Sequence, residues 1–202
     1  MNKRVIVGAI SAIAVVLILL TVGMADAHPA RAKIIMHSSH NLSKHFQLRA
    51  HFLPSSNLGK DQPNPIGYVG LAIKPAKWFF IEPAAGCNFA TSKAIVSPRI
   101  GLGYEKLSFW SVTEYTPDTE GVYWHAILSY KVLDWLLIGA EDEGWGSWDE
   151  RENISNGAGP NIQFRWNEHF GLDLAVQWKR AQDEELEWVV EPEFNARVQL
   201  FF

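Results

Sequence analysis

The fold is decided by Phe194-Asn195-Ala196-Arg197-Val198-Gln199-Leu200-Phe201-Phe202, a stretch in which apolar residues recur at every second position. Apart from Phe201, the residues between them are polar. Side chains of a strand point to opposite faces in turn, so this stretch is predicted to be a strand with one apolar and one polar face. Such a strand suits the edge of a soluble β-sandwich as well as the wall of a barrel, and the rest of the chain has to decide between them.

The chain opens with a segment that is typical of export. Lys3 and Arg4 precede an uncharged, largely apolar run at 5–24, which Ala25-Asp26-Ala27 follows. Small residues at the first and third positions of that triplet predict a signal peptide at 1–27, with cleavage after Ala27. The apolar run is also long enough to span a bilayer as a helix, so an uncleaved anchor is the alternative.

The composition narrows the class of protein. Cys87 is the only cysteine, which excludes an intramolecular disulfide and a cysteine-based metal site. The net charge is −4 and no basic run is present, so no nucleic-acid partner is expected. The nine Trp, eleven Phe and five Tyr suit a lipid–water interface. No later apolar run reaches the length of a spanning helix, so any further membrane crossing requires a closed barrel.

Alternating hydrophobicity predicts about ten strands, joined in turn by long loops and tight turns. They are placed at 42–53, 66–74, 78–83, 94–104, 107–115, 122–130, 135–141, 161–166, 170–178 and 188–202. Residues 28–41 have a weak pattern and are assigned to a periplasmic lead-in, within which 32–36 offers at most a short strand. The architecture of a soluble sandwich does not require long and short connections to alternate so regularly.

A closing strand that ends in Phe202, with this rhythm of turns and loops, resembles small bacterial outer-membrane β-barrels. The resemblance implies an all-β fold: a transmembrane, antiparallel, up-and-down barrel of about ten strands at 42–202, with eight strands as the alternative. It also implies a place in the outer membrane of a Gram-negative envelope and contact with outer-membrane lipid. In that family the barrel-assembly machinery recognises the segment that corresponds to Phe194 to Phe202. No subfamily and no oligomeric state follow from it.

Two sets of residues follow from this barrel. Aromatic residues next to a tight turn or at Phe202 are expected to form a girdle at the membrane surface, namely Trp78, Tyr104, Tyr130, Trp135, Trp166, Phe170 and Phe202. Charged residues on the polar face are expected to form a network in the lumen, namely Arg49, Glu82, Arg99, His125, Arg165, Asp173 and Arg197. Arg165 is expected diagonal to Asp173 across the turn at 167–169.

The narrow lumen favours a plug of paired charges over a narrow, porin-like channel, because so small a barrel is normally filled by side chains. A structural or adhesive role, or else a narrow pore, is therefore the first hypothesis. A barrel enzyme acting on envelope lipid or peptide at the outer rim is the second. A soluble or membrane-anchored periplasmic β protein that binds a ligand or metal is the third.

Catalytic and metal-binding signals are weak. His125 and Glu114 flank the loop at 116–121 and could face each other, but no nucleophile motif accompanies them. The segment at 141–152 is rich in carboxylates, and it lacks the spacing of an EF-hand, so it is interpreted as a solvated acidic outer loop. We therefore expect no catalytic residue, no metal and no cofactor, and an enzyme is the less favoured reading.

Overall fold

The structure of the protein is a computed structural model that describes residues 30–54, 64–147, 155–182 and 188–202. The predicted signal peptide at 1–27 lies outside these residues, as does the second part of the predicted acidic loop, 148–152. No helix in the described part of the chain has the length and apolar character that crossing a membrane requires.

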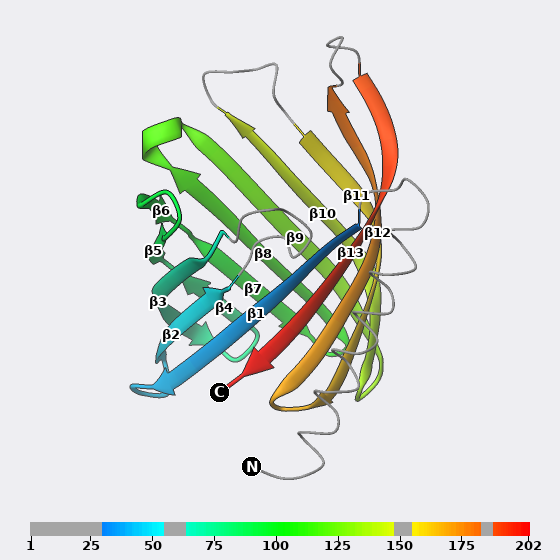
Figure 1. The fold of residues 1–202 in the computed structure, drawn as a ribbon. Coiled ribbons are helices and arrows are strands. Elements are labelled where there is room, and N and C mark those ends of the chain that lie inside the picture. The colour runs from blue at the N-terminus through cyan, green and yellow to red at the C-terminus, as the bar shows by residue number, and fades with distance from the viewer. Residues whose placement is uncertain (1–29, 55–63, 148–154, 183–187) are drawn as a thin grey trace.

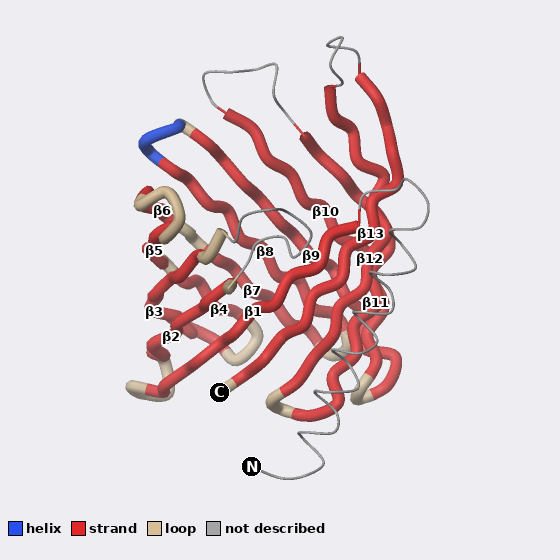
Figure 2. The backbone as a smooth tube through the Cα atoms, in the orientation of Figure 1, coloured by secondary structure: helices blue, strands red, loops and turns tan. Residues whose placement is uncertain are grey.

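The described chain consists almost entirely of strands, with one short 3-10 turn, η1 (Pro117–Thr119), among them (Figure 2). The strands are β1 (Ala30–Asn41), β2 (Phe46–Leu53), β3 (Ile66–Ala76), β4 (Phe79–Glu82), β5 (Ala84–Asn88), β6 (Lys93–Val96), β7 (Arg99–Tyr104), β8 (Leu107–Thr116), β9 (Gly121–Leu133), β10 (Leu136–Ser147), β11 (Ser155–Asn167), β12 (Phe170–Gln182) and β13 (Trp188–Phe201).

The strands close into a single barrel, because β13 returns to pair with β1 (Figure 1). β4 and β5 are two parts of one wall strand interrupted at Pro83, and β6 and β7 are likewise interrupted near Pro98. Proline has no N–H to give to a neighbouring strand, which explains both breaks. Counted this way the barrel has eleven strands, so the predicted counts of about ten and of eight were wrong.

The additional strand is β1, which occupies residues that the sequence pattern assigned to a lead-in at 28–41. It pairs with β2 in the antiparallel sense and with β13 in the parallel sense, from Ala30 opposite Phe194 to His37 opposite Phe201. An odd number of up-and-down strands leaves the first and last running the same way, so this seam has to be parallel. The barrel therefore begins at Ala30 rather than at residue 42, and it is antiparallel everywhere except at this seam.

The wall is apolar outside and polar inside, as the alternation predicted. In β9, Leu128 and Tyr130 point outward and are 53% and 44% exposed, whereas His125 and Ser129 point inward and are 6% and 3% exposed. The usual arrangement of a soluble domain, with apolar groups inside, is thus inverted.

The two ends of the barrel differ (Figure 1). The short turns at 42–45, 77–78, 105–106, 134–135 and 168–169 lie at one end together with Phe202, and we name this the turn end. The connections from β5 to β6 and from β8 to β9 lie at the opposite end, which we name the loop end.

The strands reach further toward the loop end than the sequence pattern indicated. β10 continues to Ser147 and β11 begins at Ser155, so Glu141 and Glu143 belong to a strand and are 3% and 2% exposed. The interpretation of 141–152 as a solvated acidic loop was wrong for 141–147. These carboxylates alternate with outward-facing residues, and they are buried because interior cations compensate them.

Candidate functional site: the charged interior

Glu82 is the centre of the first interior cluster and is fully buried. It lies directly opposite Arg99 in the pairing of β4 with β7, and Arg99 Nη1 donates to its carboxylate at 3.1 Å. Arg49 Nη1 from β2 donates to the second carboxylate oxygen at 3.0 Å. His51 Nε2 is 2.9 Å from Glu82 Oε1, and His51 Nδ1 is 2.7 Å from Nδ1 of His37 on β1. One carboxylate thus joins β2, β4 and β7, and His51 extends the cluster to His37 on β1.

Glu143 and Glu193 anchor a second cluster toward the loop end. Lys33 Nζ donates to Glu143 at 2.6 Å, and the Tyr123 hydroxyl donates to the same oxygen at 3.0 Å. Arg31 bonds to both carboxylates, at 3.4 Å to Glu143 and in a closer contact with Glu193. β1 therefore carries two of the cations that hold this half of the barrel together.

Arg197 lies between these clusters and is 3% exposed. Its Nη2 donates to Glu141, its Nη1 is 3.2 Å from His125 Nε2, and its Nε is 4.0 Å from Asp173 Oδ2. Asp173 also accepts a hydrogen bond from Arg165, so the diagonal contact predicted across the turn at 167–169 is present. Buried charges that are paired and hydrogen-bonded in this way are tolerated in a protein interior.

All seven residues predicted for the lumen lie on the inner face. They divide between the cluster around Glu82 and the group of Arg197 and Glu141 that lies between the two clusters. Arg49, Glu82 and Arg99 belong to the first, and His125, Arg165, Asp173 and Arg197 join the group around Glu141. Among the described residues, the sequence pattern missed six further charged members of the interior ion pairs, namely Arg31, Lys33, Glu141, Glu143, Lys179 and Glu193. Their signal was the same alternation of inward and outward residues. It lay in segments assigned to the lead-in or to charged loops, and for Glu193 in the predicted strand 188–202.

The interior also contains a cavity of about 480 Å³. Its lining reaches the turn end at Ser38, Ser39, Lys74 and Phe202, and it extends inward as far as His125 and Arg197. The residues of the cluster around Glu143 and Glu193 do not line it. The cavity is therefore a pouch that opens at the turn end and stops at the ion pairs of the loop-end half.

The proposed pair of His125 and Glu114 is not formed. Glu114 lies opposite Tyr123, and no hydrogen bond or ion pair joins it to His125 among the described residues. His125 Nε2 instead faces Arg197, with Glu141 Oε2 at 3.8 Å, and its ring stands edge-on to Trp110. Within the described residues no hydroxyl or thiol hydrogen-bonds to His125, so the geometry offers it no nucleophile to activate.

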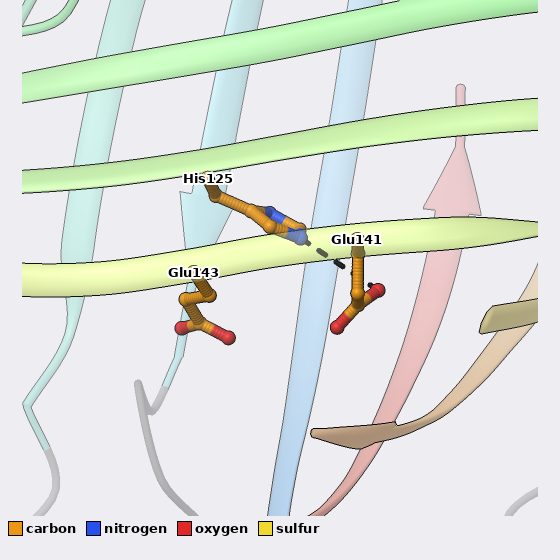
Figure 3. A group of neighbouring side chains, drawn as sticks. All are labelled: His125, Glu141 and Glu143. Carbon is orange, nitrogen blue, oxygen red and sulfur yellow. Dashed lines mark ion pairs between the residues drawn. The ribbon is translucent and has the colours of Figure 1, made fainter. Parts of the chain in front are cut away.

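His125, Glu141 and Glu143 come close enough together to suggest a metal site, with ligand atoms within 4.8 Å of one another (Figure 3). Both carboxylates are already engaged by cations, Glu141 by Arg197 and Glu143 by Lys33. A divalent cation at this point would have to displace an arginine and a lysine that are themselves buried. The charge arrangement therefore disfavours a metal.

Zn²⁺ and EDTA should each leave the free energy of unfolding unchanged to within about 0.5 kcal/mol, because His125, Glu141 and Glu143 have no uncompensated charge to offer. Urea titrations of the whole chain in detergent micelles would measure this. His125→Gln serves as the control, since a zinc effect due to exposed histidines would persist in that variant. A zinc-dependent stabilisation that EDTA reverses and His125→Gln abolishes would contradict the expectation.

The aromatic residues predicted for the girdle occupy the turn-end half of the barrel. Trp78, Tyr104, Tyr130, Trp135, Trp166 and Phe202 are exposed, from 44% for Tyr130 to 73% for Tyr104. Phe170 differs, since it is 3% exposed and belongs to a buried outer-face cluster with Ala32, Leu172 and Val198. Its ring packs beside Trp166, at a centroid distance of 5.1 Å.

No family model, no curated protein and no solved structure matches this chain. Its class is defined by the structure itself: a closed, eleven-stranded, mostly antiparallel β-barrel with a buried charged network inside.

Proposed function

We propose that the protein is an outer-membrane β-barrel whose lumen does not conduct. The observation that carries this proposal is the inverted polarity of the wall, with apolar side chains exposed outward and charged side chains buried inward. Large apolar residues are exposed on every wall strand from β2 to β4 and from β6 to β13. Water penalises so large an apolar surface, whereas lipid tails would cover it.

The aromatic rings of the turn end support the same orientation. Indole and phenol rings are favoured at the boundary between lipid and water, and six exposed rings lie near the short turns. In outer-membrane barrels the short turns face the periplasm. The turn end is thus the periplasmic end in this proposal, and the loop end faces outward.

The ion pairs favour a plug over a pore. Arg31, Lys33 and Tyr123 converge on Glu143 in the loop-end half, and the cavity stops short of them. An ion crossing the barrel would have to separate buried pairs, which costs several kcal/mol per pair. A structural role in the envelope, combined with a pouch open to the periplasm, accounts for these features better than conduction does.

Two measurements test the proposal. The chain should be recovered with the outer membrane and should migrate differently on a gel before and after heating, as a closed barrel does. In planar bilayers the purified chain should produce no conductance steps. Recovery as a free periplasmic protein would exclude the membrane assignment, and stable conductance steps would exclude the closed lumen.

We also propose that the barrel-assembly machinery binds Phe194 to Phe202. Phe202 lies at the seam, where its N–H donates to the His37 carbonyl at 2.8 Å and its carbonyl accepts from Ser39 N–H at 3.3 Å. Phe202 is 69% exposed. The residue thus both closes the seam and presents an aromatic ring to a partner.

Deleting Phe202 should reduce the yield of heat-modifiable barrel about tenfold, because both seam hydrogen bonds and the exposed ring are lost. Phe201→Ala should have a smaller effect, since Phe201 stacks on His37 inside the barrel and its backbone stays in place. Phe202→Ala separates the contribution of the ring from that of the seam hydrogen bonds, because it removes the ring and keeps the backbone. Equal yields from the deletion and from Phe201→Ala would contradict the proposed role.

A further inference from the structure

The pouch at the turn end has an excess of positive charge. The side chains that line it carry four permanent positive charges, on Arg49, Lys74, Arg165 and Arg197, and two carboxylates, on Glu82 and Asp173. Behind this lining, Arg99 contacts Glu82, while Glu141 and Glu143 contact Arg197. Lys33 pairs with Glu143, so these two cations and two carboxylates cancel and leave the excess unchanged. The interior pairs therefore do not use up all the positive charge that faces the cavity.

Specific donors in the pouch lack acceptors. Arg197 Nε is buried and has no hydrogen-bond partner within the described structure, although the rest of its guanidinium is bonded. Lys74, at the mouth, forms no ion pair with any described residue. The nearest carboxylate to this N–H, Asp173, is 4.0 Å away, too far for a hydrogen bond. Buried donors in proteins nearly always have a hydrogen-bond partner, so this N–H of a cavity-lining residue indicates a place for an acceptor oxygen.

Flat apolar surfaces accompany these donors. The Phe80 ring lies under the Arg49 guanidinium, with its centroid 4.3 Å from the Arg49 Cζ, and Trp110 stands against His125. Ser108 and Ser129 contribute hydroxyl groups on the same lining. A volume of about 480 Å³ is within the range of pockets that hold small organic molecules.

We propose that this pouch binds a small organic anion, in which a carboxylate or phosphate group is attached to a flat apolar part, and that the ligand enters from the turn end. The anionic group lies near Arg197 and Arg165, and the flat part packs against Phe80 and Trp110. Lys74 attracts the anion at the mouth. The inference rests on the interior of the barrel and holds whether or not the barrel lies in a membrane.

The test uses the whole chain purified in detergent micelles and titrated calorimetrically with four probes. Benzoate and phenyl phosphate carry the proposed anionic group and a ring, benzylamine carries the opposite charge on the same ring, and inorganic phosphate lacks the ring. Benzoate or phenyl phosphate should bind, and which of the two binds more tightly identifies the preferred oxyanion. Benzylamine should not bind, and inorganic phosphate should bind more weakly than phenyl phosphate.

Two variants probe the site, and a third serves as a control. Lys74→Glu reverses the charge at the mouth and should weaken binding of the anions at least about tenfold. Ser108→Trp fills the pouch without changing its charge and should abolish binding. Lys44→Glu makes the same charge change on the neighbouring turn at 42–45, away from the lining, and should leave binding unchanged.

The same titrations can overturn the proposal. Equal binding of benzylamine and benzoate would show that the pouch does not select anions. Equal weakening by Lys44→Glu and Lys74→Glu would show a general surface effect in place of a site. If every variant still shows the heat shift of a folded barrel and no anion binds to the unaltered chain, the pouch holds only solvent and the proposal fails. Absence of the heat shift in the unaltered chain would count against the proposed outer-membrane barrel, separately from the ligand.

Discussion

Glu82→Gln is expected to lower the free energy of unfolding by about 3–5 kcal/mol, the cost of removing one partner from a buried ion pair. Glu82 is fully buried, and Arg49, Arg99 and His51 all direct a nitrogen at its carboxylate within 3.1 Å. The amide keeps the size of the side chain but removes its charge, so the buried Arg99 and the half-buried Arg49 would lose their counter-charge. Urea titration in detergent micelles, followed by tryptophan fluorescence, measures the change.

The matched control is Glu168→Gln in a turn at the same end of the barrel. Glu168 has a side chain that is 86% exposed, 3.6 Å from His169, and exposed pairs contribute little to stability. We therefore expect a change within about 0.5 kcal/mol for this variant. A similar small change for Glu82→Gln would mean that the interior cluster does not hold the barrel closed.

Leu128→Arg is expected to destabilise the barrel by about 2–4 kcal/mol in lipid vesicles, the cost of an arginine at the middle of a bilayer-facing strand. Leu128 is 53% exposed on the outer face of β9, opposite Phe109 and Ala140 on the two neighbouring strands. Its environment is solvent if the barrel is soluble and hydrocarbon if the barrel spans a membrane. The change in stability caused by Leu128→Arg therefore distinguishes a soluble barrel from a membrane-spanning one.

Val132→Arg is the control for depth. Val132 points outward from the same strand and is 42% exposed, but it lies close to the turn at 134–135. The cost of an arginine falls to about 0–1 kcal/mol near the membrane surface. In vesicles, Leu128→Arg should thus have a clearly lower refolding yield and a clearly lower urea midpoint than Val132→Arg. Equal stability of both variants and the unaltered chain would argue for a soluble barrel.

Much of the wall could be predicted from the sequence because side-chain facing is a local property. Residues two apart in a strand share a face whatever the strand pairs with, so Leu128 and His125 could be assigned to opposite faces before any pairing was known. The turn at 167–169 is also a local feature, and the prediction from it that Arg165 contacts Asp173 is confirmed. The inward position of Glu82 and the outward position of Ile81 followed from the same rule.

The strand count could not be predicted in this way. A barrel can close only if its first and last strands meet, and that contact joins residues more than a hundred positions apart, such as Lys33 opposite Arg197. The rule that bacterial barrels have an even number of strands favoured a lead-in at 28–41. The alternation of Arg31, Lys33 and His37 with Ala32, Ile34 and Met36 was present in the printed sequence, but nothing local showed which strand it would pair with.

Within the strands that it located, the sequence by itself determined which side chains share a face, and it located the tight turns, since both depend on residues a few positions apart. Only the tertiary structure decided that there are eleven strands, that β1 closes the barrel beside β13, and that Glu141 and Glu143 are interior groups. A carboxylate can be buried only where cations from other strands reach it. Whether Arg197 and Lys33 reach Glu141 and Glu143 depends on the closure of the whole barrel, which no single stretch of the chain contains.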